Sequence, residues 1–178
     1  CFANKGVWVE PTYILRIEDK NGNVIFNSHP KTREALSEET AFKMVELLSG
    51  IAAYGPIIKG EKTYGRGIRL RSSAKPYGNI PYSIKIAGKT GTTQNQSDGW
   101  FMGVTPELVT GTWVGGIYPE IAFSNTKQGQ GATLALPIFA KFYSSLNNDK
   151  NYTKISGAKF PLIKEEWQEE LACDPFKE

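Results

Sequence analysis

Five consecutive residues in "AGKTGTTQN" (87–95) are of types that suit an active site: Lys89, Thr90, Gly91, Thr92 and Thr93. Side chains alternate along a strand, so Thr90 and Thr92 share one face while Lys89 and Gly91 share the other. A site built against the strand's edge can use all of them. The lysine supplies a cation, the hydroxyls hold a carboxylate, the glycine leaves room, and a backbone N–H can join an oxyanion hole. The run is either a turn leaving a strand or one wall of an active site.

The sequence gives little support for a Ser-His-Asp triad, a nucleotide-binding loop or a metal site. His29 is the one histidine of the chain and lies in the polar loop "FNSHPKT", where we expect it to face solvent. The sequence contains no Gly-x-Ser-x-Gly elbow for a Ser-His-Asp triad and no nucleotide-binding glycine fingerprint. One histidine and two distant cysteines do not make a metal site, so we expect neither metal nor cofactor.

Composition limits the partners of the chain. A net charge of +3 over 178 residues is too small to indicate nucleic-acid binding. No apolar run reaches membrane-spanning length, and the first residues do not resemble a signal peptide. The chain begins with Cys1 rather than Met, so we expect a piece of a longer protein; Cys1 and Cys173 are either bridged or free.

Hydrophobic periodicity predicts the elements that position the Lys-Thr-Gly run. A β-hairpin is expected over 12–27, turning at Asn21-Gly22, and an extended connection over 55–81. Strands are expected over 82–92, 100–107 and 108–116, and Thr105-Pro106-Glu107 forms the turn between the last two. Short turns between successive strands indicate antiparallel pairing.

Three helices are expected beside these strands. The first lies in 36–55, with Ser37 as its N-cap and an apolar face of Ala41, Met44, Val45, Leu48 and Ala52. The second covers 132–146, with Pro137 near its start or at a kink, and carries Ala135, Ile138, Phe139, Phe142 and Leu146 at helical spacing. A short polar helix is expected in 162–178. The predicted class is α+β, an antiparallel sheet with packed helices.

Two further patterns have competing interpretations. The basic residues Arg66, Arg69, Arg71 and Lys75 either meet an anion or form a solvated strand edge, which the alternation of Arg69 and Arg71 around Leu70 favours. The aromatic residues of the strands favour sheet packing over a ligand-stacking platform: Trp100, Phe101 and Trp113.

The stretch "IAGKTGTTQNQSDGWFMGVTPELVTGTWVGG" resembles the C-terminal part of the transpeptidase domain of class A (bifunctional) penicillin-binding proteins. The segments "FANKGVWVEPTYILRIEDKNGNVIF", "LSEETAFKMVELL" and "GQGATLALPIFAKFY" match that family in the same order, so the resemblance covers about residues 2–145. It implies a partial penicillin-binding/transpeptidase domain of the serine β-lactamase-like fold.

The resemblance also implies a function. The parent protein would carry a glycosyltransferase domain, a DD-transpeptidase domain and a membrane anchor, and would act at the extracytoplasmic (periplasmic) face of the bacterial cell membrane. Its transpeptidase would attack stem peptides ending in D-Ala-D-Ala through a serine and would be acylated by β-lactam antibiotics. Lys89 would belong to the catalytic charge network. Thr90, Gly91, Thr92 and Thr93 would form the substrate-binding strand, with the Thr92 N–H as an oxyanion donor.

The family needs Ser-x-x-Lys and Ser-x-Asn before its Lys-Thr-Gly. Three Ser-x-x-Lys matches exist, starting at Ser28, Ser72 and Ser124. The first includes Pro30 in a loop, the second precedes Pro76, and the third follows Lys-Thr-Gly. Ser145-Leu-Asn147 also comes too late. We therefore expect residues 1–178 to be the C-terminal portion of the domain, without the nucleophile and inactive alone.

Two departures from the family pattern and two alternative functions remain. Arg66 in "GRG" stands where the family usually has Thr, and "GGIYPEIAF" lacks the acidic-Arg pair common after the Gly pair. The alternatives are a non-catalytic module that binds muropeptides or a partner protein, and a β-lactamase or DD-carboxypeptidase relative.

Overall fold

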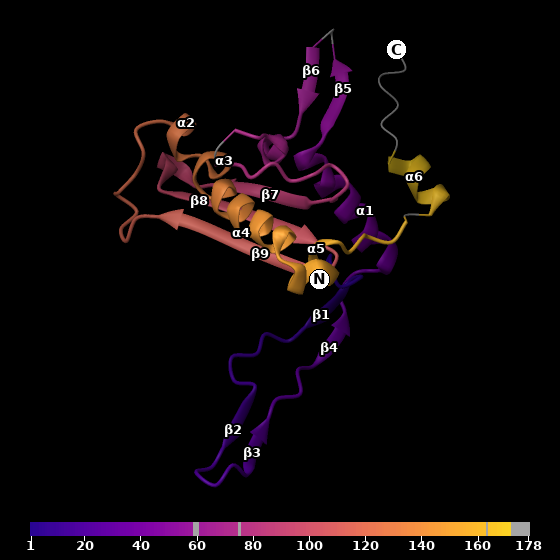
Figure 1. Cartoon of the computed structure of the whole chain (residues 1–178), viewed down its shortest axis with the longest axis vertical. Coiled ribbons are helices and arrows are strands. Elements are labelled where there is room, and N and C mark those ends of the chain that lie inside the picture. Colours follow the sequence, from indigo (N-terminus) through magenta and orange to yellow (C-terminus); the bar gives the residue numbers. More distant parts are fainter. Residues whose placement is uncertain (59–60, 75, 163, 172–178) are drawn as a thin grey trace.

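The structure is a computed structural model that describes residues 1–58, 61–74, 76–162 and 164–171. Its centre is a three-stranded antiparallel sheet in the order β7-β8-β9 (Figure 1). The strands are β7 (Ala87–Thr92), β8 (Asp98–Thr105) and β9 (Leu108–Gly115). Pro106 and Glu107 form the β8–β9 turn, which confirms the two strands predicted over 100–116.

Two helices that follow the sheet in the chain pack against one of its faces. The short helix α3 (Gly131–Leu134) leads directly into α4 (Leu136–Asn148), and Pro137 lies in the first turn of α4. Proline is tolerated there because the first N–H groups of a helix have no partner within it. The predicted helix over 132–146, with Pro137 near a start, is confirmed. Figure 1 shows α4 lying across one face of the sheet.

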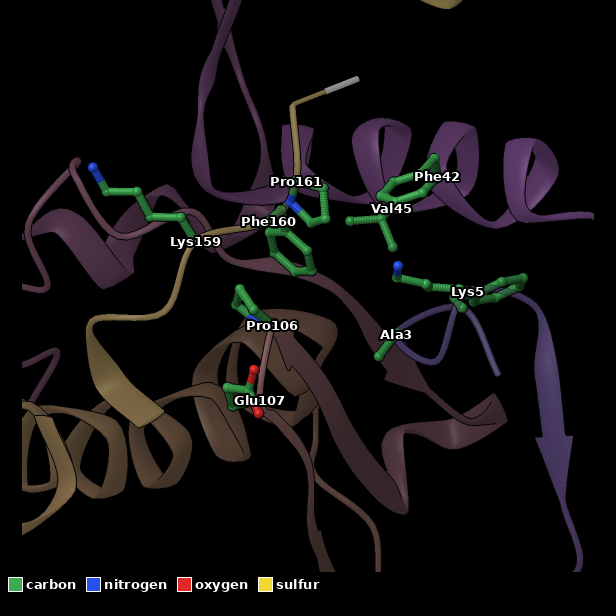
Figure 2. Close-up of a pocket in the computed structure, with 10 residues that line it drawn as sticks. Ala3, Lys5, Phe42, Val45, Pro106, Glu107, Lys159, Phe160 and Pro161 are labelled. Carbon is green, nitrogen blue, oxygen red and sulfur yellow. The ribbon is translucent and has the colours of Figure 1, made fainter. Parts of the chain in front are cut away.

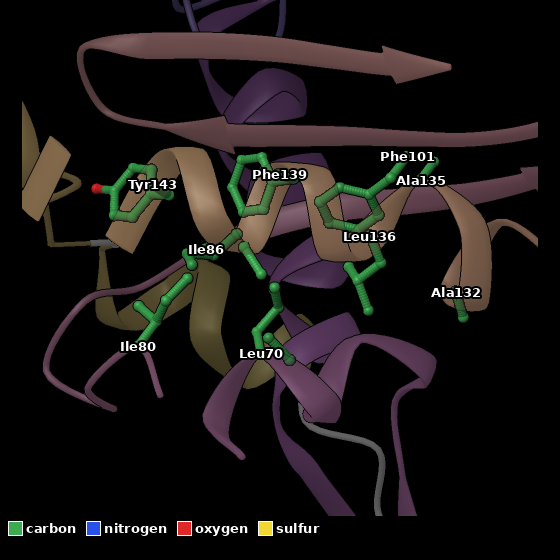
Figure 3. Close-up of a cluster of buried hydrophobic side chains, with 11 residues drawn as sticks. Leu70, Ile80, Ile86, Phe101, Ala132, Ala135, Leu136, Phe139 and Tyr143 are labelled. Atoms are coloured by element: carbon green, nitrogen blue, oxygen red, sulfur yellow. The ribbon is translucent and has the colours of Figure 1, made fainter. Parts of the chain in front are cut away.

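The core lies between this helix and the sheet (Figure 3). The Phe139 ring packs 4.9 Å from the Phe101 ring and 5.6 Å from the Tyr143 ring, measured between centroids. Leu70 and Ile80 close the same cluster from the segment before β7. Such close aromatic packing adds to the hydrophobic gain of burial. The helices and the antiparallel sheet together give the α+β class that the sequence predicts.

The first helix, α1 (Glu38–Ser49), packs against β7. The Ser37 side chain accepts a hydrogen bond from the Thr40 N–H, which confirms the predicted N-cap. The helix ends earlier than the predicted range 36–55, because the chain tightens into the 3₁₀ turn η1 (Gly50–Ala52). Ala41 and Val45 are the buried residues of α1, and Ala52 reaches the core from η1.

The extended connection predicted over 55–81 is wrong. Strands β5 (Tyr54–Ile58) and β6 (Glu61–Tyr64) form a hairpin, followed by the 3₁₀ helix η2 (Arg66–Arg71). A Cβ on Gly65 would lie 2.2 Å from the carbonyl oxygens of Gly50 and Ile51, so η2 can pack against η1 only with glycine there. The interpretation of Arg69 and Arg71 as part of a strand edge is also wrong. Both residues lie in the 3₁₀ helix η2, and Leu70 between them is buried.

The strand predicted over 82–92 begins later, at Ala87, and the Arg71 side chain holds the segment just before it. Its guanidinium donates to the carbonyl oxygens of Pro81 at 2.6 Å and Ile84 at 3.0 Å, and further to those of Ala52 and Ile80 at 3.3 Å. Burial lowers the pKa of this guanidinium from its ordinary value.

The N-terminal segment up to Glu34 forms a long two-stranded arm (Figure 1). Strand β1 (Val7–Val9) pairs with β4 (Thr32–Glu34), and β2 (Arg16–Glu18) pairs with β3 (Val24–Asn27) further out. The hairpin predicted over 12–27 is confirmed. The Asp19 carboxylate accepts from the side chain and N–H of Asn23, which lowers its pKa. His29 is exposed on this arm, as predicted.

Short elements complete the chain: η3 (Gln94–Gln96), α2 (Thr126–Gly129), η4 (Lys150–Tyr152), α5 (Thr153–Ser156) and α6 (Glu165–Leu171). Helix α6 confirms the short C-terminal helix expected in 162–178. The Cys1 thiol is free and exposed. Lys75 and Cys173 lie outside the described residues.

Candidate functional site

Strand β7 presents the Lys-Thr-Gly run as the sequence predicts. Thr90 is opposite Phe101 and Lys89 is opposite Met102 in the register with β8. Phe101 is buried under α4, whereas Met102 is 41% exposed. Thr90 and Thr92 therefore lie on the face covered by α3 and α4, and Lys89 and Gly91 lie on the opposite face.

Strand β7 is also an edge strand, since β8 is its one partner among the described strands. A cavity of about 310 Å³ lies along this edge. It brings together residues from four segments: Arg66, Lys89, Thr90, Thr92, Thr126, Gln130 and Ala132. The cavity therefore uses residues from both faces of the strand, an arrangement that a site built against the strand's edge would need.

The cavity's hydroxyl and amine groups are held by backbone groups. The Lys89 Nζ donates to the Thr90 carbonyl at 2.7 Å, and the Gly131 N–H donates to the Thr92 Oγ1 at 3.1 Å. Because Thr92 accepts from Gly131, its hydroxyl hydrogen remains to be donated to a ligand oxygen. A Cβ on Gly131 would lie 2.3 Å from the Trp100 carbonyl oxygen and 2.4 Å from that of Gly91, so only glycine permits this approach.

Thr93 differs from the two threonines of the cavity. Its Oγ1 lies 2.9 Å from the Ser97 Oγ and accepts from the Asp98 N–H at 3.0 Å. The Asp98 carboxylate in turn accepts from the Ser97 hydroxyl at 3.1 Å and from the Trp113 Nε1–H at 2.9 Å. Thr93 thus belongs to a hydrogen-bonded turn that connects β7 to β8.

That turn is strained. Asn95 and Gln96 have φ angles of 59° and 54°, in the left-handed region that residues other than glycine rarely adopt. Sequence reasoning missed Asp98 and Gly131 as positioning residues. Both occur in the segments that matched the family, but their contacts with β7 and with the Thr93 turn come from distant parts of the chain.

The aromatic residues lie where sheet packing requires. Phe101 is in the core, and the rings of Trp100 and Trp113 lie 6.4 Å apart on the opposite face. Beside the cavity, the Arg66 Nη1 donates to the Gln130 Oε1 at 3.2 Å. Arg69 donates to the Tyr77 hydroxyl and to Thr133 Oγ1, both at 3.3 Å.

A smaller cavity of about 180 Å³ lies near the β8–β9 turn, at the other end of the sheet from Thr92 (Figure 2). It is lined by Phe2, Ala3, Lys5, Phe42, Val45, Pro106, Glu107, Lys159, Phe160 and Pro161. Its apolar walls come from the N-terminal segment, α1 and residues 159–161. Since it shares no residue with the Lys-Thr-Gly cavity, it is a separate feature.

Comparison with known proteins identifies the family. The family model for the penicillin binding protein transpeptidase domain matches residues 1–144. The chain belongs to the penicillin-binding protein transpeptidase family. Penicillin-binding protein 1A of Clostridium acetobutylicum is 32% identical over 118 residues, which cover 66% of this chain and 12% of that protein. Penicillin-binding protein 1A of Aquifex aeolicus is 31% identical over 141 residues, covering 79% of this chain and 16% of that protein.

Solved structures share the fold of this chain. Penicillin-binding protein 1A from Haemophilus influenzae matches with a TM-score of 0.67 at 23% identity, over 92% of this chain and 26% of that one. The D,D-transpeptidase domain of a peptidoglycan glycosyltransferase from Eggerthella lenta matches with a TM-score of 0.51, over 82% of this chain and 29% of that one. The chain therefore spans less than a third of each of these proteins.

The Ser-x-x-Lys matches of this chain begin at serines that do not line its Lys-Thr-Gly cavity. Ser28 is on the N-terminal arm, the Ser72 Oγ accepts from the Ala74 N–H, and the Ser124 hydroxyl donates to Gln128 Oε1. Among the residues that the structure describes, no serine lines the cavity. Within the described ranges, no three His, Cys, Asp or Glu residues group as metal ligands, and no helix is long and apolar enough to cross a bilayer.

Proposed function

We propose that this chain is part of a bifunctional peptidoglycan synthase, carrying the substrate-binding strand of its DD-transpeptidase. The synthase joins glycosyltransferase and DD-transpeptidase activities, cross-links stem peptides through a serine acyl-enzyme and binds penicillin. The observation that carries the proposal is the edge cavity of β7. In a chain of the transpeptidase family, this cavity combines Lys89 with Thr90 and Thr92.

The residues of the strand have distinct roles in this proposal. Lys89 is a cation in the catalytic charge network. Thr90 and Thr92 donate hydroxyl hydrogens to the terminal carboxylate of a stem peptide ending in D-Ala-D-Ala, or to that of a β-lactam. Gly91 keeps the edge of the strand open, and the Thr92 N–H is one oxyanion donor. Thr93 supports this edge from the turn, through its bonds with Ser97 and Asp98.

An extended peptide can bind along the free edge of β7. The side of β7 away from β8 has no strand partner among the described residues, and an extended peptide can take that place. The Thr90 and Thr92 hydroxyls then hold its C-terminal carboxylate. This geometry supports a peptide substrate more strongly than a compact ligand.

The nucleophile, in this proposal, belongs to another part of the protein. Residues 1–178 form the C-terminal portion of the transpeptidase domain, and the Ser-x-x-Lys and Ser-x-Asn motifs lie in its N-terminal half. The face of the sheet that carries Lys89 supports this view because its apolar side chains are half exposed: Trp100 44%, Met102 41%, Val109 53% and Trp113 48%. A nucleophile docked on this face stands beside Lys89.

The parent protein acts at the extracytoplasmic (periplasmic) face of the cell membrane, where stem peptides and penicillins are met. Its membrane anchor and glycosyltransferase domain lie outside these residues. Neither nucleic acid, metal nor cofactor has a role in the proposed reaction.

Labelled penicillin tests the proposal. We expect no covalent adduct with this chain alone, because its serines lie outside the cavity. A longer chain from the same gene, which adds the N-terminal half, is expected to form one adduct per molecule. The longer chain with Thr90→Val is the matched variant and should acylate more slowly. Stoichiometric labelling of the short chain would overturn the proposal that the nucleophile lies outside residues 1–178. If the longer chain is not labelled, the proposed function is overturned.

A further inference from the structure

Arg66 occupies a position at the Lys-Thr-Gly cavity that the family resemblance does not explain. It is the first residue of η2 and lines the cavity of about 310 Å³ together with Lys89, Thr90 and Thr92. It also lines a neighbouring cavity of about 350 Å³ that shares Lys89 and Thr90. Arg66 thus joins Lys89 as a second cationic side chain at the edge of β7.

The backbone beneath Arg66 is tightly placed. Gly65 contacts the carbonyls of Gly50 and Ile51 so closely that a Cβ would lie 2.2 Å from each. Gly67 is buried against Ile51. The start of η2 is therefore pressed onto η1 by two glycines, and the exposed side chain between them must project outward toward the cavity.

The three arginines of η2 have different partners. Arg71 is committed to four backbone carbonyls, and Arg69 donates to Tyr77, Ala132 and Thr133. Arg66 makes one neutral hydrogen bond, to the Gln130 side chain, and pairs with no carboxylate among the described residues. Since a guanidinium has five N–H donors, Arg66 keeps capacity for a ligand.

Gln130 connects Arg66 to the predicted carboxylate site. It precedes Gly131, whose N–H holds the Thr92 hydroxyl. A carboxylate that accepts from Thr90 and Thr92 would also meet the Arg66 fork, which binds carboxylates in a bidentate way. The threonine that the family usually has at this position carries no charge, and its side chain is too short to bind a carboxylate in this way.

We propose that Arg66 is a substrate-binding residue that acts with Lys89, Thr90 and Thr92 to select peptides with a free C-terminal carboxylate. The inference rests on the proposed function, because it assumes that the β7 edge holds that carboxylate. It goes beyond that function by assigning part of the binding to a residue outside the strand.

The test is a titration of the full chain, labelled with ¹⁵N, followed by NMR. The ligands are N-acetylated D-Ala-D-Ala as the free acid and as its C-terminal amide. We expect the free acid to shift the amides of residues 89–92 and to bind more tightly than the amide. Arg66→Gln should weaken the acid roughly three- to tenfold and leave the amide unchanged, as expected for one charge-assisted contact. The affinity of the Arg66→Lys chain for the free acid should lie between those of the unaltered chain and of Arg66→Gln.

Two controls separate the inference from the proposed function. Lys141→Gln removes an equal charge from an exposed position on α4 and should bind the acid as the unaltered chain does. If Thr90→Val weakens the acid but Arg66→Gln does not, the inference is overturned and the proposed function survives. If the unaltered chain binds acid and amide equally, or neither up to the solubility limit of the peptides, the carboxylate site itself is overturned.

Discussion

Neighbouring threonines of similar chemistry have different surroundings in this chain. The Thr92 hydroxyl accepts from the Gly131 N–H at 3.1 Å and faces the cavity, so it can donate to a ligand. The Thr93 hydroxyl is bonded to Ser97 and Asp98 within the turn. Direct binding of substrate by Thr93 stays a prediction. What distinguishes the two residues is which distant backbone group lies beside each hydroxyl.

The phenol of Tyr143 gives the stability of the chain a testable pH dependence. The Tyr143 phenol is fully buried and donates to the Ser156 carbonyl at 3.3 Å. Burial raises its pKa above the ordinary value of 10.0, because the charged form loses its hydration. The neutral phenol thus contributes stability that is present below pH 10.0 and lost as the pH rises from there through the folded-state pKa.

We expect the free energy of unfolding to fall above pH 10.0, and Tyr143→Phe to reduce that fall. Urea denaturation at neutral and alkaline pH measures both. The exposed Tyr118→Phe is the control and should leave the alkaline slope unchanged. An equal slope in the Tyr143→Phe chain and the unaltered chain would contradict the assignment.

Helix α3 illustrates how an element of one turn can position a site. It lies close against β7 and β8, since Gly131 approaches the Gly91 and Trp100 carbonyls and the Leu134 side chain packs on Gly99. This approach brings the Gly131 N–H to Thr92 and places Gln130 beside Arg66. Small residues on both elements are therefore a requirement of the site as well as of the core.

Gly131→Ala tests the role of that contact. The added methyl would lie 2.3 Å from the Trp100 carbonyl oxygen, so α3 must shift away from β7 and the Thr92 bond must lengthen. Overpacking of this kind costs about 1–3 kcal/mol. Urea denaturation should show this loss, and the free acid of N-acetylated D-Ala-D-Ala should bind more weakly. Ser145→Ala, exposed on α4, should change stability by less than about 0.5 kcal/mol; an equal effect of both would refute the steric argument.

The whole molecule has a sheet with unequally covered faces. The face beneath α4 holds the core, whereas the other leaves Trp100, Met102 and Trp113 half exposed. Exposed apolar groups gathered on one sheet face are typical of a surface that another part of a protein covers. The proposed N-terminal half of the domain accounts for this surface.

Val109→Thr tests whether the face is covered in a longer protein. In this chain Val109 is 53% exposed, so the melting temperature should change little, corresponding to less than about 0.5 kcal/mol. In the longer chain with the N-terminal half, a covered Val109 should make the same change cost about 1 kcal/mol or more. The measurement is thermal unfolding of the short and the longer chain, each with and without Val109→Thr. Equal losses of stability in both chains would contradict the proposed cover.

Local signals explain which elements could be predicted. The Asn21-Gly22 turn, the Ser37 cap, the alternation through Phe101 and the position of Pro137 depend on neighbours within a few residues, and all four are found in the structure. The segment 55–86 could not be predicted in this way. Its fold depends on glycines that contact η1 and on Arg71, whose guanidinium collects carbonyls from residues up to 19 positions away.

The amino-acid sequence by itself determined the family, the α+β class and the strand that carries Lys89, Thr90 and Thr92. These follow from residue types and their spacing along one segment. Only the tertiary structure decided that this strand is an edge, that Gly131 holds Thr92, and that Arg66 lies beside the same cavity. The physical reason is that these contacts join segments that lie up to 64 residues apart, and no local pattern encodes which backbone groups will meet across such distances.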